Sequence, residues 1–316
     1  MAYRSFIRQA IWLSLYANVF CPGCKGPVGS AVTDTPNNGS IRISVDESFE
    51  PVVREQIRVY EGLHPGTRII ASYKPEAECL KDLVRDSATR MVIVTRGLSR
   101  SEERYFSDSI GFVPSWDRLA SDAIALVVNG RSNDTLYTRE GLRKLLSGQM
   151  DNRKKLVFDG LSATSAYRLA VDSILKGAAP DSEKVKAVKG SAAVLDFVAS
   201  DTNAVGFLGF SWIGNPDDPA QRELLKKVKI AYIRCEACGD SPYVKPTQWG
   251  IMTKRYPLVR GFYTIVKENY SGLGSGFAAF MRFEKGQLIF RRAYLSPGKI
   301  GFNERNVRIN ENPGGN

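Results

Sequence analysis

The sequence predicts an α/β protein built mainly on parallel sheets. Short strand-like runs alternate with helical patterns from residue 41 to about residue 290, without an internal repeat. Two of the runs, residues 91–94 and 123–128, are wholly apolar, as strands covered on both faces are. Between residues 167 and 175, apolar side chains recur at helical spacing and end before Gly177. In such a fold, ligands bind at the carboxyl ends of the strands.

Apolar runs and period-two alternation give the expected strands, and apolar residues three and four apart give the expected helices. The expected strands are residues 41–45, 67–71, 91–94, 123–128, 156–158, 204–208 and 228–233. The expected helices are residues 53–60, 77–85, 167–175, 194–198 and 259–266, with one more beginning at residue 277.

The first thirty residues are typical of an export signal. Arg4 and Arg8 precede an apolar stretch that is too short to span a bilayer. Basic residues followed by a short apolar stretch are typical of a secretory leader. We expect residues 1–31 to be a signal peptide or lipoprotein tether, with Cys21 or Cys24 as the possible lipidation site. The sequence therefore predicts a protein of the periplasm or cell envelope, in contact with the membrane only through such an anchor.

The remaining cysteines favour a disulfide over a metal site. Cys235 and Cys238 are close enough to pair in an oxidising compartment. A zinc knuckle with Cys21 and Cys24 is the alternative, but more than two hundred residues separate the two pairs. Cys79 is expected to be a small buried hydrophobe. We expect no metal and no cofactor.

The charge balance points to an anionic partner of small size. The chain has 316 residues and a formal net charge of +11, yet basic and acidic residues are interspersed throughout. A nucleic-acid surface would gather its basic residues on one element, so nucleic acid is not expected as a partner. The single histidine, His64, lies in a Leu-His-Pro-Gly turn that suits a helix stop better than a catalytic base. We expect a binding protein and not an enzyme.

Hydroxyl, glycine and basic residues follow three of the expected strands, directly before a helix. Backbone N–H groups, hydroxyls and a guanidinium from several such loops could together hold a tetrahedral oxyanion. The candidate ligand-binding residues are Ser48, Phe49, Lys74, Thr95, Arg96, Ser162, Ala163, Thr164 and Ser165.

Several segments resemble the phosphate-binding proteins of ABC importers, over roughly residues 40–297. The run from Ala120 to Asn129 is similar to the strand that crosses between the two lobes of that family. Residues 136–148 resemble the segment that follows it, and Ser162-Ala163-Thr164 stands where the family has its S-G-T anion loop. Residues 203–207 and 286–297 resemble two further family segments.

The resemblance implies a two-lobed type II periplasmic binding protein fold with a hinge between the lobes. We expect one lobe from residues 40–126 and 228–297, the other from residues 127–227, and a loose tail over residues 298–316. The implied function is an exported, monomeric protein that captures phosphate or a related oxyanion for ABC permease subunits. The alternatives are a molybdate- or sulfate-type binder, and a sensor or surface interaction protein that reuses the fold.

Three positions depart from the family pattern. The first loop reads Glu47-Ser48-Phe49 instead of G-S-S/T, and Ala163 replaces the glycine of S-G-T. The arginine that the family places before S-G-T is absent, because Phe158-Asp159-Gly160 stands there. Arg96, with Lys74, is therefore expected to supply the missing positive charge.

Overall fold

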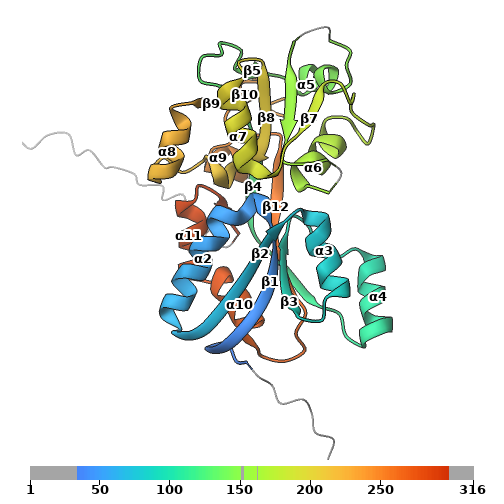
Figure 1. Cartoon of the computed structure of the whole chain (residues 1–316), viewed down its shortest axis with the longest axis vertical. Coiled ribbons are helices and arrows are strands. Elements are labelled where there is room, and N and C mark those ends of the chain that lie inside the picture. Colours follow the sequence, from blue (N-terminus) through green and yellow to red (C-terminus); the bar gives the residue numbers. More distant parts are fainter. Residues whose placement is uncertain (1–33, 151–152, 162, 299–316) are drawn as a thin grey trace, which may run out of the picture. The chain divides into compact units, whose positions relative to one another are not determined.

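The computed structural model describes residues 34–150, 153–161 and 163–298, and these residues form two α/β lobes (Figure 1). The expected leader, the lipidation cysteines, Ser162 and the expected tail after Gly298 lie outside them. The elements of the first half are β1 (Asn38–Asp46), η1 (Glu47–Phe49), α2 (Glu50–Leu63), β2 (Gly66–Lys74), α3 (Glu76–Arg85), β3 (Thr89–Val94), α4 (Arg100–Ile110), β4 (Ser115–Asn129), β5 (Leu136–Tyr137), α5 (Arg139–Leu146) and β6 (Lys155–Phe158).

The second half continues the same alternation of strands and helices. Its elements are α6 (Ser165–Ser173), β7 (Val185–Ala187), α7 (Gly190–Ser200), β8 (Ala204–Gly209), η2 (Phe210–Trp212), α8 (Pro219–Leu225), β9 (Val228–Ile230), β10 (Tyr232–Arg234), β11 (Tyr243–Val244), α9 (Gln248–Met252), β12 (Val259–Val266), α10 (Leu273–Arg282), α11 (Glu284–Arg292) and β13 (Ser296–Pro297).

The first lobe is built on the strand order β2-β1-β3-β12-β4. β1 pairs in parallel with β2 and β3, whereas β12 runs antiparallel to both β3 and β4. One face packs against α2, α10 and α11 around Phe277 and Phe290, which are fully buried. The other face packs against α3 and α4 through Cys79 and Phe106. Cys79 is thus the buried apolar residue that the sequence predicts.

The second lobe continues the same sheet in the order β4-β8-β6-β7 (Figure 1). β6 pairs in parallel with β7 and β8, while β8 and β9 run antiparallel to the C-terminal half of β4. Apolar side chains of α5, α6 and α7 fill a separate core with these strands. The predicted α/β fold with two lobes is confirmed, and every antiparallel pair of this large sheet involves one of the crossing strands, β4 or β12.

Two segments differ from the sequence-based expectations. Residues 259–266 form strand β12, whereas their apolar spacing predicted a helix. Val228, Ile233, Ile251 and Leu258 pack in the core of the second lobe, whereas the whole segment from residue 228 was expected in the first. The segment belongs to the second lobe by packing, because β9 adds to the C-terminal half of β4 and the chain leaves this core only after Leu258.

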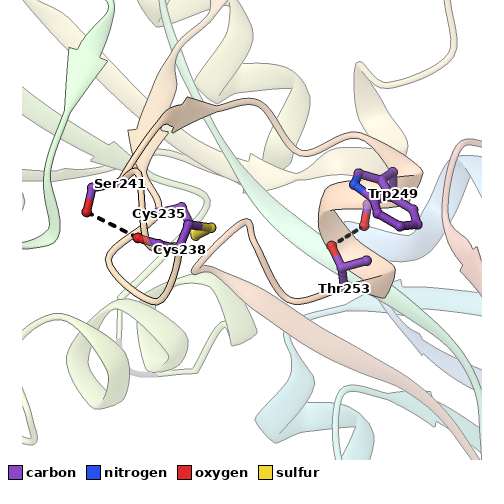
Figure 2. Close-up of a disulfide and its surroundings, with 5 residues drawn as sticks. All are labelled: Cys235, Cys238, Ser241, Trp249 and Thr253. Atoms are coloured by element: carbon purple, nitrogen blue, oxygen red, sulfur yellow. Dashed lines mark hydrogen bonds between the residues drawn. A yellow bond between two sulfur atoms is a disulfide. The ribbon is translucent and has the colours of Figure 1, made fainter.

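A disulfide joins Cys235 to Cys238, closing a short loop between β10 and β11 (Figure 2). The Ser241 hydroxyl donates to the Cys238 carbonyl at 3.3 Å within this loop. Helix α9 follows, where the Thr253 hydroxyl donates to the Trp249 carbonyl at 2.7 Å. The indole of Trp249 is more than half exposed.

Candidate functional site

The first loop of the candidate site is held by its own aspartate. Asp46 ends β1 and caps η1, and its Oδ1 accepts from the Ser48 backbone N–H at 3.0 Å and from the Ser48 hydroxyl at 2.8 Å. The Ser48 Oγ lies 3.4 Å from the Oγ of Ser165, at the start of α6 in the second lobe. Ser48 and Ser165, both predicted from strand ends, are therefore brought together where the lobes meet.

Glu47 places a carboxylate on the N-terminus of α7 in the other lobe. Its two oxygens accept from the Ser191 N–H at 2.7 Å and from the Ser191 hydroxyl at 3.0 Å. Gly190 directly precedes Ser191 and has φ +82°. A Cβ at Gly190 would lie 3.0 Å from the Glu47 carboxylate. Burial raises the pKa of Glu47, and the bonds from Ser191 oppose that rise. A helix N-terminus is a natural position for an anion, and here a side chain of the protein occupies it.

Glu76 makes a second direct connection between the lobes. Its Oε1 accepts from the backbone N–H of Thr95 at 2.9 Å, and also from the Thr95 hydroxyl. Arg168 of α6 donates to Glu76 Oε2 at 2.9 Å and to the Thr95 hydroxyl at 2.6 Å. The predicted site residue Thr95 is thus bonded to protein groups from both lobes.

A buried ion pair lies at the crossing between the lobes. Arg260 of β12 and Asp122 of β4 are register partners, and two guanidinium nitrogens lie 2.9 and 2.6 Å from Asp122 Oδ2. The third guanidinium nitrogen donates to the Ser165 hydroxyl at 2.6 Å, and the Arg260 Cζ lies 4.7 Å from the centre of the Phe49 ring. Both charged side chains are almost wholly buried, so each depends on the other for compensation of its charge.

Two further carboxylates make this meeting point strongly acidic. Asp46 and Asp159 are both buried, and each has one oxygen without a hydrogen-bond partner among the described residues. Burial, reinforced by the charge of Asp46, raises the pKa of Asp159 to about 7. Burial also raises the pKa of Asp46, although Arg260 opposes the rise. The raised pKa values mean that negative charge is already disfavoured among these buried carboxyls, so an added oxyanion would be disfavoured there as well.

A groove with the opposite charge lies beside this meeting point, along the two crossing strands. We call it the basic groove, and its volume is about 430 Å³. Its lining includes Thr95 with four basic residues, and no Asp or Glu is among the described residues that line it. The basic residues are Arg96, Arg118, Lys254 and Arg260. This arrangement suits a negatively charged solute.

The remaining predicted site residues have other partners. Phe49 is fully buried in the first core, against Phe262. Lys74 forms an ion pair with Asp82 of α3 at 2.7 Å. The Ala163 carbonyl accepts from the backbone N–H of Ala77 at 3.0 Å, which adds another bond between the lobes.

Thr164 is buried before α6, and its hydroxyl lies 3.4 Å from the Gly160 carbonyl. Arg96 lines the basic groove, yet its guanidinium nitrogens donate to the Glu102 carboxylate at 2.7 and 2.8 Å. The Arg96 guanidinium holds the pKa of Glu102 at about 2. Arg96 is therefore committed to a partner within its own lobe.

Sequence reasoning did not single out Asp122 and Arg260, although a signal was present. Asp122 directly precedes the apolar run of residues 123–128, Arg260 is the one charged residue of β12, and a buried charge requires a partner. Arg118 and Lys254 carried no comparable signal, because exposed basic residues are common on any surface.

The sequence matches the family model of the PBP superfamily domain over residues 30–283. The chain belongs to this superfamily. The match extends through both lobes and both crossings, which agrees with the strand order of the sheet. No curated protein matches the chain at a significant level.

Solved structures of phosphate-binding proteins share the fold. A candidate phosphate ABC transporter substrate-binding protein from Clostridium perfringens, solved with bound phosphate, is 18% identical with a TM-score of 0.67, and the match covers 83% of this chain and 100% of that one. An ABC-type phosphate transport receptor from Vibrio cholerae is 20% identical with a TM-score of 0.58, and the match covers 82% of this chain and 100% of that one. At these identities the likeness establishes the fold.

Two other features of the described residues bear on function. Within the described residues, no helix combines the length and apolar character needed to cross a bilayer. Histidine, cysteine and acidic side chains do not gather anywhere in this part of the chain in a group that could hold a metal ion.

Proposed function

We propose that this protein is an exported solute-binding protein that captures an anionic solute, phosphate or a related oxyanion, for import by an ABC permease. The observation that carries the proposal is the basic groove, where Arg118 and Lys254 have no carboxylate partner among the described residues and lie beside the paired cations Arg96 and Arg260. The shared fold with phosphate-binding proteins supports it. The proposal assigns binding to the chain, without catalysis.

The proposed position of the anion differs from the one expected from the sequence. Ser48, Thr164 and Ser165 lie beside buried carboxylates, and their hydroxyls contact protein groups. Thr95 and Arg96 line the basic groove, but both are bonded to protein groups, Thr95 to Glu76 and Arg96 to Glu102, so neither is assigned a contact with the anion. We place the anion against the crossing strands, where the nearby charges are positive.

Export is part of the same proposal. The disulfide between Cys235 and Cys238 supports it, because such bonds persist in oxidising compartments. We propose that the mature chain begins between residues 21 and 32, is a monomer, and is held at the membrane by a lipid if Cys21 or Cys24 is retained. Mass spectrometry of the protein from the cell envelope checks this, and an intact Met1 would contradict it.

Calorimetric titration tests the binding function. The purified protein is titrated with phosphate, sulfate and molybdate at low and at moderate salt, with chloride as the reference anion. We expect saturable binding of at least one oxyanion or of an organic molecule that carries one. Heats indistinguishable from chloride for all of these solutes would contradict the proposed function.

A further inference from the structure

The size of the basic groove exceeds what a simple oxyanion needs. Its volume of about 430 Å³ falls in the range of about 300–1,000 Å³ that is usual for sites of organic ligands. A tetrahedral oxyanion has only five heavy atoms and would leave most of this space to water. The groove therefore has room for a solute whose anionic group is one part of a larger molecule.

The cations that are available to a solute lie on two elements from different lobes. Arg118 is exposed on β4, and one of its guanidinium nitrogens donates to the Ser121 hydroxyl at 2.8 Å. Lys254 follows α9 in the second lobe, with φ at +55°. Among the described residues, its ammonium makes no hydrogen bond or ion pair. Arg96 and Arg260, in contrast, are engaged by carboxylates. An anionic group would thus bind between Arg118 and Lys254.

An exposed aromatic surface adjoins these cations. Tyr263 lines the groove and is the register partner of Arg118 on the neighbouring strand. Trp116 lies two residues before Arg118 on the same face of β4, and its ring centre is 6.0 Å from that of Tyr263. The Trp116 indole is 43% exposed and donates to Glu103 at 3.1 Å, which fixes its orientation.

The backbone is adapted to this aromatic position. The Trp116 indole lies directly over Gly97, where a Cβ would come within 2.5 Å of the ring. Glycine at residue 97 therefore lets the indole lie flat beside the loop that carries Arg96. An exposed, oriented indole next to cationic groups presents a planar apolar face to the part of a solute that extends from its anionic group.

We infer that the basic groove takes an organic phosphate, with the phosphate group between Arg118 and Lys254 and a ring of the solute against Tyr263 and Trp116. This inference rests on the proposed function, because it names the class of anionic solute that the same groove would hold. It accounts for the volume, for the two available cations and for the aromatic surface together.

Titration with matched solutes tests the inference. The full chain is titrated with adenosine 5′-monophosphate, glucose 6-phosphate, inorganic phosphate and adenosine. We expect at least one of the two esters to bind about tenfold or more tightly than inorganic phosphate, and adenosine to bind too weakly to measure, because the charge-assisted contacts are lost. An inorganic phosphate affinity equal to that of both esters would overturn the inference and leave the proposed function standing.

Variants identify which contacts are used. Arg118→Gln should weaken binding of the ester about tenfold or more, and Trp116→Leu should weaken the ester by a similar factor while changing phosphate binding less than twofold. Arg104→Gln on α4 removes an exposed arginine away from the groove and is the matched control, with no change expected. Ester binding that survives both groove substitutions would also overturn the inference, and failure of every anion to bind would contradict the proposed function itself.

Discussion

Replacing the buried carboxyl of Asp159 by an amide should make the protein more stable, and increasingly so as the pH rises. The folded pKa of Asp159 is about 7, against an ordinary value of 3.8. A raised folded pKa means that the native state keeps a proton which the unfolded chain has lost. Stability contributed by this proton is lost as the pH rises from about 4 to about 7. Asp159→Asn has no proton to lose at this position.

The size of the effect follows from the two pKa values. Their difference of about three units corresponds to about 4 kcal/mol at 1.36 kcal/mol per unit, reached once the pH exceeds 7. At pH 5 the unfolded carboxyl has already ionised, so part of this difference, about 1–2 kcal/mol, is present there. The advantage of Asp159→Asn over the natural protein should therefore grow by about 2–3 kcal/mol between pH 5 and pH 8.

Urea unfolding at pH 5, 6, 7 and 8 measures this difference directly. Asp108→Asn on the exposed face of α4 is the matched control, because it makes the same substitution at an exposed position. A constant difference between Asp159→Asn and the natural protein at all four pH values would refute the reasoning. It would mean that Asp159 ionises freely in the folded state.

Three further variants test other contacts. Arg96→Ala should lower the free energy of unfolding by about 0.2–1 kcal/mol, because the ion pair that it breaks is partly exposed, and should leave anion affinity nearly unchanged in titrations. Replacing both Cys235 and Cys238 by serine should lower the free energy of unfolding by about 2 kcal/mol, because the disulfide no longer restricts the unfolded chain over a loop of this length. Thermal unfolding without reductant measures this loss. Arg260→Leu should lower the free energy of unfolding in urea by about 3–5 kcal/mol, because it leaves Asp122 buried without its partner. A double variant that also replaces Asp122 by leucine should recover much of this loss.

The fold was predictable wherever burial alone decides the structure. Residues 91–94 and 123–128 are apolar throughout because both faces of these strands are covered, and both are strands in the structure. The same burial misled the interpretation of β12. Its apolar residues Val259, Phe262 and Val266 recur at helical spacing because the strand does not alternate, and pairing with β3 and β4 decides its conformation. That pairing is non-local and leaves no trace in a short window of sequence.

The candidate site was predictable as a region and not as a set of contacts. The rule that ligands bind at strand ends located Thr95 and Ser165, which do lie where the lobes meet. The partners of these residues could not be foreseen, because Glu76 and Arg168 are 92 positions apart in the chain. The net charge where the lobes meet depends on such long-range ion pairs. The position proposed for the anion depends on that charge, so it could not be predicted from the sequence either.

The crossing strands determine how firmly the lobes are joined. β4 runs without interruption from its pairing with β12 to its pairing with β8, so the connection is a hydrogen-bonded ribbon and not a flexible tether. The pair Asp122 and Arg260 bonds the two crossing strands to each other within this ribbon. Glu47 and Glu76 bond to the opposite lobe through side chains outside this ribbon, so the lobes can separate only if these bonds break.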